Sequence, residues 1–103
     1  MANFLLAYKA GAGPGTPEEG QAAMAAWMAW FGSMGTAVVD IGNPFGPSKT
    51  VSLEGVSDGG DSELSGYSIV SAAGIDAAVA LAKGCPIVAG GGSVEVYQIH
   101  PAT

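Results

Sequence analysis

The feature that most constrains this chain is the apolar run at residues 3–8, Asn-Phe-Leu-Leu-Ala-Tyr. Its length and composition are typical of a β-strand, whose side chains alternate between two faces. Phe4, Leu6 and Tyr8 fall on one face, and Leu5 and Ala7 fall on the other. Both faces are therefore apolar, and leaving either in water would expose a large apolar patch. We expect helices to cover one face and a second sheet to cover the other.

The pattern along the rest of the chain predicts a single α+β domain over residues 1–103. Thr16, Pro17 and Glu19 supply an N-cap, a first-turn proline and a capping box, and Gly35 is suited to end the helix that they begin. The predicted elements are strands at 3–8, 37–41, 66–71 and 93–99, a short additional strand at 49–53, a polar turn region at 54–65, and helices at 16–35 and 75–83. The order β-α-β-(β)-β-α-β, with two helices on one face of an antiparallel sheet, is the ferredoxin-like arrangement.

Charge and cysteine content argue against several classes of protein. The formal net charge is −6, with three lysines and no arginine, so the basic footprint needed for nucleic acid or an anionic membrane is missing. A single cysteine, Cys85, allows no internal disulfide and no cysteine-based zinc site. The sequence has neither an apolar run long enough to span a membrane nor a basic leader, so we expect a soluble cytoplasmic protein. Nothing predicts a metal or a cofactor.

The first predicted helix has two unlike faces. Met24, Trp27, Met28, Phe31 and Met34 form an apolar stripe at helical spacing. The opposite face consists of small residues and has no lysine: Ala22, Ala25, Ala29, Gly32 and Ser33. An outer face without charge is often covered by a partner. Together with the doubly apolar first strand, this face predicts a homodimer or a higher homo-oligomer.

Asp40 is the strongest single candidate for chemistry. It ends the apolar run Val38-Val39 and precedes a loop that contains Gly42, Pro44 and Phe45. Burial would raise the pKa of its carboxyl group and allow it to act as a general acid or base. The alternative is an aspartate that accepts backbone N–H bonds from the turn that follows it. The first interpretation predicts that the carboxylate points into a partly enclosed space beside Phe45 and the first helix.

Several short motifs, in this order and spacing, resemble the YCII-related, or DGPF, family over most of the chain. The motifs are the strand–helix opening, Asp40 with Gly42, Pro44 and Phe45, Gly66-Tyr67-Ser68-Ile69-Val70, the alanine-rich second helix ending at Pro86, and Gly92-Ser93-Val94-Glu95-Val96. The resemblance implies a dimeric α+β barrel, in which two ferredoxin-like sheets pack together. The same fold is found in muconolactone isomerases and small monooxygenases. The resemblance also allows a regulatory role, since some DGPF proteins are linked to alternative sigma factors.

Two departures from the family pattern bear on chemistry. The family pattern has Asp, Gly, Pro and Phe at consecutive positions, whereas here these four residue types are spread over residues 40–45. In family members that look catalytic, this aspartate pairs with a histidine on the first helix, and that position falls near Met24 here. The only histidine in the chain is His100, so an acid–base dyad would need His100 of a partner chain. Whether the protein is an enzyme is therefore left open.

Three classes of function remain. The first is a small-molecule binding or sensing protein whose site contains Asp40, Phe45, Met24, Trp27, Met28 and Phe31. The absence of arginine disfavours bidentate capture of anions, so a neutral or cationic ligand is expected. The second class is an enzyme of lyase, isomerase or hydrolase type that uses Asp40 as its acid–base group. The third is a regulatory or structural partner protein without ligand chemistry.

Overall fold

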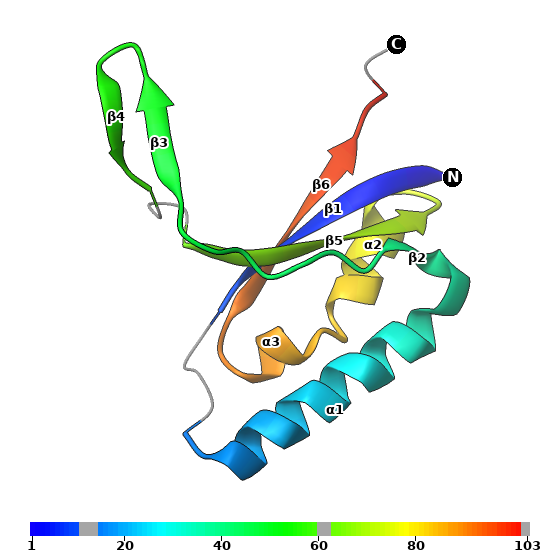
Figure 1. Cartoon of the computed structure of the whole chain (residues 1–103). Helices are drawn as coiled ribbons and strands as arrows, with labels where there is room; N and C mark the ends of the chain where they lie inside the picture. Colours follow the sequence, from blue (N-terminus) through cyan, green and yellow to red (C-terminus); the bar gives the residue numbers. More distant parts are fainter. Residues whose placement is uncertain (11–14, 60–62, 102–103) are drawn as a thin grey trace.

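The computed structural model describes residues 1–10, 15–59 and 63–101 and shows an α+β fold with an antiparallel sheet. The elements are β1 (Ala2–Lys9), α1 (Pro17–Met34), a 3₁₀ turn (Gly35–Ala37), β2 (Val38–Asp40), β3 (Lys49–Ser52), β4 (Gly55–Asp58), β5 (Leu64–Ala72), α2 (Ile75–Ala82), α3 (Pro86–Ala89) and β6 (Ser93–Ile99). Four strands form one sheet in the order β2-β5-β1-β6, and β3 pairs with β4 in a separate hairpin. The helices α1, α2 and α3 lie on one side of the four-stranded sheet (Figure 1).

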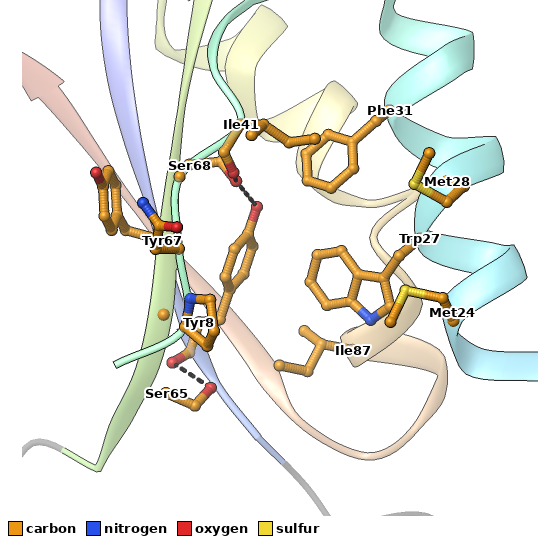
Figure 2. Close-up of a pocket in the computed structure, with 14 residues that line it drawn as sticks. Tyr8, Met24, Trp27, Met28, Phe31, Ile41, Ser65, Tyr67, Ser68 and Ile87 are labelled. Atoms are coloured by element: carbon orange, nitrogen blue, oxygen red, sulfur yellow. Dashed lines mark hydrogen bonds between the residues drawn. The ribbon is translucent and has the colours of Figure 1, made fainter. Parts of the chain in front are cut away.

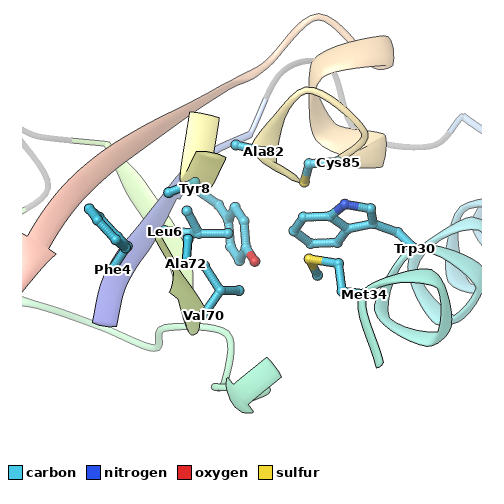
Figure 3. Packing of buried hydrophobic residues seen from close by; sticks show 10 residues of the cluster. Phe4, Leu6, Tyr8, Trp30, Met34, Val70, Ala72, Ala82 and Cys85 are labelled. Carbon is cyan, nitrogen blue, oxygen red and sulfur yellow. The ribbon is translucent and has the colours of Figure 1, made fainter. Parts of the chain in front are cut away.

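The core lies between the sheet and these helices. β1 is central and pairs antiparallel with β5 and β6, so that Phe4 lies opposite Val70 and Leu6 opposite Val96 on the same face. Trp30 of α1 packs against this face and donates its indole N–H to the carbonyl oxygen of Leu81 in α2 at 3.0 Å. The buried cluster comprises Phe4, Leu6, Tyr8, Trp30, Met34, Val70, Ala72, Ala78, Ala82 and Cys85 (Figure 3). One face of β1 is thus covered as the sequence predicted.

The opposite face of the sheet carries no helix in the part of the chain that the structure describes (Figure 1). Burial alternates along β5, where the residues facing the helices are buried and those facing away are half-buried. Large side chains stay accessible on the outward face, with Tyr97 53% and Val39 53% exposed. The described chain therefore covers only one of the two faces that the apolar first strand requires to be covered.

The start of α1 follows its sequence signals. The Thr16 side-chain oxygen accepts a hydrogen bond from the Glu19 backbone N–H at 3.1 Å, and Pro17 occupies the first turn. The Glu19 carboxylate in turn accepts from the Gly15 N–H at 2.8 Å, one residue before the position expected in a capping box. Gly35 ends the helix with a φ of 55°, which favours glycine. The predicted limits of this helix are confirmed.

Two local predictions need correction. The region 54–65 was predicted as a turn, yet Gly55–Asp58 forms β4 and Leu64 begins β5; residues 60–62 lie outside the described part. β4 forms because it pairs with β3 through backbone hydrogen bonds. Its own composition is polar and does not predict a strand. The chain also forms the short helix α3 after Cys85, beginning at Pro86, where the missing N–H costs nothing.

None of the helices in the described residues has both the length and the apolar character needed to cross a membrane.

The loop after β2 depends on a glycine at position 42. Gly42 has a φ of 77°, and a Cβ atom added there would overlap the backbone carbonyl of Tyr67. Gly46, in the same loop, has open space around it. The approach of this loop to β5 therefore requires glycine at the first position and not at the second.

We predict that Gly42→Ala lowers the free energy of unfolding by about 2 kcal/mol or more, because it adds both strain at positive φ and a backbone clash. Gly46→Ala is the matched control and should change stability by less than about 1 kcal/mol. Urea unfolding followed by circular dichroism measures both. Equal effects of the two substitutions would show that the close approach at Gly42 is not a constraint.

Candidate functional site

A pocket of about 400 Å³ opens between α1 and the β5 side of the sheet. Its helix wall is formed by Met24, Trp27, Met28 and Phe31 (Figure 2). The remaining wall is formed by Tyr8 of β1, by Ile41, Gly42, Asn43 and Pro44 after β2, by residues 65–68 of β5, and by Ile87 of α3. A cavity of this size is typical of sites that enclose a small molecule.

The helix wall arises from the spacing of its residues. Positions 24, 27, 28 and 31 are three or four residues apart, which places them on one face of a helix. Trp27 is half-buried, whereas Met24 and Met28 are 65% and 62% exposed and stand at the mouth. The Trp27 ring meets the Tyr8 ring edge-on, with centroids 5.0 Å apart. The structure thus brings together the four helix residues selected from the sequence, and their binding role stays a prediction.

Three hydroxyl groups of the pocket are engaged in hydrogen bonds within the protein. The Tyr8 hydroxyl donates to Ser68 Oγ at 2.7 Å, and Ser68 Oγ donates to the Ile41 carbonyl oxygen at 2.6 Å. Ser65 Oγ donates to the Tyr8 carbonyl oxygen at 3.1 Å. Burial raises the pKa of Tyr8 to about 12, so its hydroxyl stays protonated near neutral pH. None of the described residues that line the pocket is an aspartate, glutamate, lysine, arginine or histidine.

Asp40 does not line this pocket, and the prediction that its carboxylate enters an enclosed space is wrong. Asp40 is exposed and pairs with Ile69, after a register shift at the edge strand β2. Its Oδ1 atom accepts the Gly42 backbone N–H at 2.8 Å, and Oδ2 lies 3.5 Å from the Tyr67 hydroxyl. The physical reason is the local turn, which holds the carboxylate at the outer side of the loop.

Phe45 lies apart from the pocket as well. It is 48% exposed and stacks on Tyr67, with ring centroids 5.8 Å apart. The Tyr67 side chain points away from α1, as Figure 2 shows, because it alternates with the inward-facing Ser68. Asp40 and Phe45 therefore lie outside the pocket, on the outer side of the half-buried Tyr67, which belongs to the pocket wall. The predicted site is divided into a helix half that lines the pocket and a loop half that does not.

Tyr8 and Ser68 were missing from the sequence-based site. The signal was present in β5, where the predicted strand places Ser68 between Gly66 and Val70 on one face. A serine in the middle of a buried strand face needs a hydrogen-bond partner, and Tyr8 on the neighbouring strand supplies one. What the sequence could not provide is the pairing of β1 with β5, which brings these residues together.

His100 and Asp40 lie at opposite edges of the sheet. His100 is exposed and follows β6, whereas Asp40 ends β2, and both central strands lie between them. Three interstrand spacings correspond to roughly 14 Å, so one chain cannot form a hydrogen bond between the two side chains. Within the described ranges, no three histidine, cysteine, aspartate or glutamate side chains gather as a metal site.

Comparison with known proteins assigns no family: no protein-family model matches the chain, and no curated protein matches it.

For Asp40, we predict that replacement by alanine lowers the free energy of unfolding by about 1 kcal/mol, because the Gly42 N–H loses its acceptor. Asp40→Asn keeps an acceptor oxygen at the same place and should stay within about 0.5 kcal/mol of the wild type. Chemical denaturation at pH 7 distinguishes the two. A larger loss for asparagine than for alanine would mean that the negative charge, and not the turn, is what the fold uses.

A second prediction concerns alkaline pH. Burial raises the folded-state pKa of Tyr8 to about 12 and that of Cys85 to about 11. The unfolded chain releases these protons first, so the free energy of unfolding falls by roughly 1 kcal/mol per pH unit, between about pH 9 and 11 for Cys85 and between about pH 10 and 12 for Tyr8.

Tyr8→Phe should flatten this decline between about pH 10 and pH 12, whatever its effect at pH 7. The wild-type protein, unfolded at the same pH values, is the reference. The measurement is urea unfolding in steps of pH. An unchanged slope in Tyr8→Phe would show that the Tyr8 hydroxyl is not the buried group responsible.

Proposed function

We propose that this protein binds a small, uncharged, predominantly apolar molecule in the pocket between α1 and β5. The observation that carries the proposal is the lining of the pocket, in which the Tyr8, Trp27 and Phe31 rings surround a space of about 400 Å³. The Tyr8, Ser65 and Ser68 hydroxyls donate hydrogen bonds to groups of the protein, so a ligand is recognised mainly by shape, apolar burial and ring packing.

The methionines at the mouth support this function over a purely structural role for α1. Met24 and Met28 remain 65% and 62% exposed beside a cavity that their side chains could cover. Methionine is unbranched and polarisable, and it adapts to ligands of different outline. An apolar ligand would bury these side chains and gain about 25 cal/mol for each Å² of apolar area removed from water.

We further propose that the chain adopts the ferredoxin-like arrangement and pairs as a dimeric α+β barrel, in keeping with its resemblance to the YCII-related family. The strand order β2-β5-β1-β6, with α1 between β1 and β2 and α2 between β5 and β6, supports the first part. The accessible outward face of the sheet supports the second, because a matching face of another copy would cover it.

The ligand proposal is tested with N-phenyl-1-naphthylamine, a neutral aromatic probe whose fluorescence rises in apolar surroundings. We predict saturable binding and a higher melting temperature, since the probe binds the native state. Met28→Glu should weaken binding about tenfold or more, because it places a charge against an apolar ligand.

Ala29→Glu adds the same charge one position along, at an exposed residue that does not line the pocket, and should leave affinity within about twofold. Asp40→Asn should also leave it unchanged. No binding by the wild type, or equal losses in both glutamate variants, would contradict the proposal. A loss of affinity in Asp40→Asn as large as that in Met28→Glu would show that Asp40 belongs to the ligand site.

A further inference from the structure

The hairpin β3–β4 stands away from the body of the protein. It projects on the side of the sheet opposite the helices (Figure 1). Every residue of both strands is exposed. Its base continues the ladder through a hydrogen bond from the Gly59 N–H to the Ser48 carbonyl oxygen at 3.3 Å. The hairpin is thus a regular element that packs on nothing within the described chain.

The two faces of this hairpin differ in chemistry. Val51 pairs with Val56, and Lys49 pairs with Asp58, which places these four side chains on one face. Thr50, Ser52 and Ser57 occupy the other, hydroxyl-bearing face. On the first face, Val51 and Val56 are 77% and 69% exposed. A cross-strand valine pair on one side and hydroxyls on the other is the pattern of a strand pair with one buried face.

The contacts within the hairpin do not explain its apolar face. A two-stranded hairpin is marginally stable in water unless it packs against something else. The Lys49–Asp58 ion pair measures 2.8 Å but is largely solvent-exposed, and such pairs contribute little to stability. Leu53 at the tip is fully exposed as well. Burial of the Val51, Leu53 and Val56 side chains would supply such packing.

The shape of the molecule bears on what would bury these side chains. The principal extents are 44 × 43 × 18 Å, so the chain is only two layers thick, and its radius of gyration of 15.0 Å exceeds the roughly 13 Å usual for this length. A sheet face of four strands, each about seven residues long, spans roughly 450 Å². A stable protein interface takes about 800 Å² from each partner. The sheet face alone is too small, and the hairpin extends the surface on the same side.

The local charge permits a second copy of the chain as the occupant. The protein as a whole carries a net charge of −6, which would repel a second copy. On the outward sheet face, however, Lys9 lies 3.6 Å from Glu95, and on the hairpin Lys49 pairs with Asp58. Much of the remaining acid is elsewhere, for example Glu18 and Glu19 in the first turn of α1. A surface with internally paired charges can meet its own copy without strong repulsion.

We propose that the β3–β4 hairpin is an arm that packs its Val51–Val56 face, with Leu53 at its tip, against a second copy of this chain, beside the contact between the two sheets. The inference rests on the proposed dimer and adds a second contact surface to it. By two-fold symmetry, each copy gives one arm and receives one.

The test introduces a pair of opposite charges on one face of the hairpin at a time. The double variant Val51→Lys with Val56→Glu places an opposite-charge pair on the apolar face and keeps the hairpin paired. The matched control, Thr50→Lys with Ser57→Glu, introduces the same pair on the hydroxyl face. Sedimentation velocity over a concentration series gives the dimer dissociation constant of each protein. The first variant should raise that constant about tenfold or more, and the control should stay within about twofold.

The outcomes separate the arm from the dimer and from ligand binding. A wild-type protein that is monomeric at about 50 μM would overturn both the dimer and the arm. A dimer that both variants leave intact, or weaken equally, would overturn the arm alone. Because the hairpin lies outside the pocket and the core, melting temperature and N-phenyl-1-naphthylamine binding should be unchanged at a concentration low enough for all three proteins to be monomeric. Failure of probe binding would bear on the proposed function and not on the arm.

Discussion

The buried hydroxyl of Tyr8 links the parts on which the rest of the structure depends. It donates to Ser68 of β5, and Ser68 donates to the carbonyl oxygen of Ile41 in the loop after β2, so one chain of hydrogen bonds joins two central strands to that loop. The Tyr8 ring also packs edge-on against Trp27 of α1. In a low-dielectric interior an unmade bond in this chain would be costly, which favours one position for strand, loop and helix. The floor of the pocket is therefore formed by the same contacts that fix the fold.

The turn at Gly42 determines what kind of site the loop can provide. Asp40 uses one carboxylate oxygen to hold the Gly42 N–H, and Gly42 allows the following residues to run close to β5. Ile41 and Pro44 consequently line the pocket while the carboxylate stays outside it. An acid–base group is thereby separated from the apolar space, which is more consistent with binding by shape and burial than with proton transfer at Asp40. The exposed methionines at the mouth fit that interpretation.

The outward face of the sheet and the hairpin both expose apolar side chains to water. An α+β layer pair buries the helix-facing side chains, but Tyr97 and Ile99 remain accessible on the other side of β6. The hairpin, which has a further apolar face, projects on that same side of the sheet (Figure 1). Apolar side chains gain free energy only when water is removed from them. A second layer supplied by another copy would satisfy both surfaces at once, and this is why we treat them as one interface.

The sequence by itself determined the local features of this protein. Thr16, Pro17 and Glu19 defined the start of α1, and the three- and four-residue spacing from Met24 to Phe31 placed the pocket-lining side chains on one face, because capping and helical periodicity depend only on neighbours in the chain. Tertiary structure decided the side of the sheet on which Asp40 lies and the Tyr8–Ser68 bond. Both depend on strand pairing between distant residues. A shift of one residue in that pairing turns a side chain to the opposite face of the sheet, and the local sequence pattern does not specify which pairing is formed.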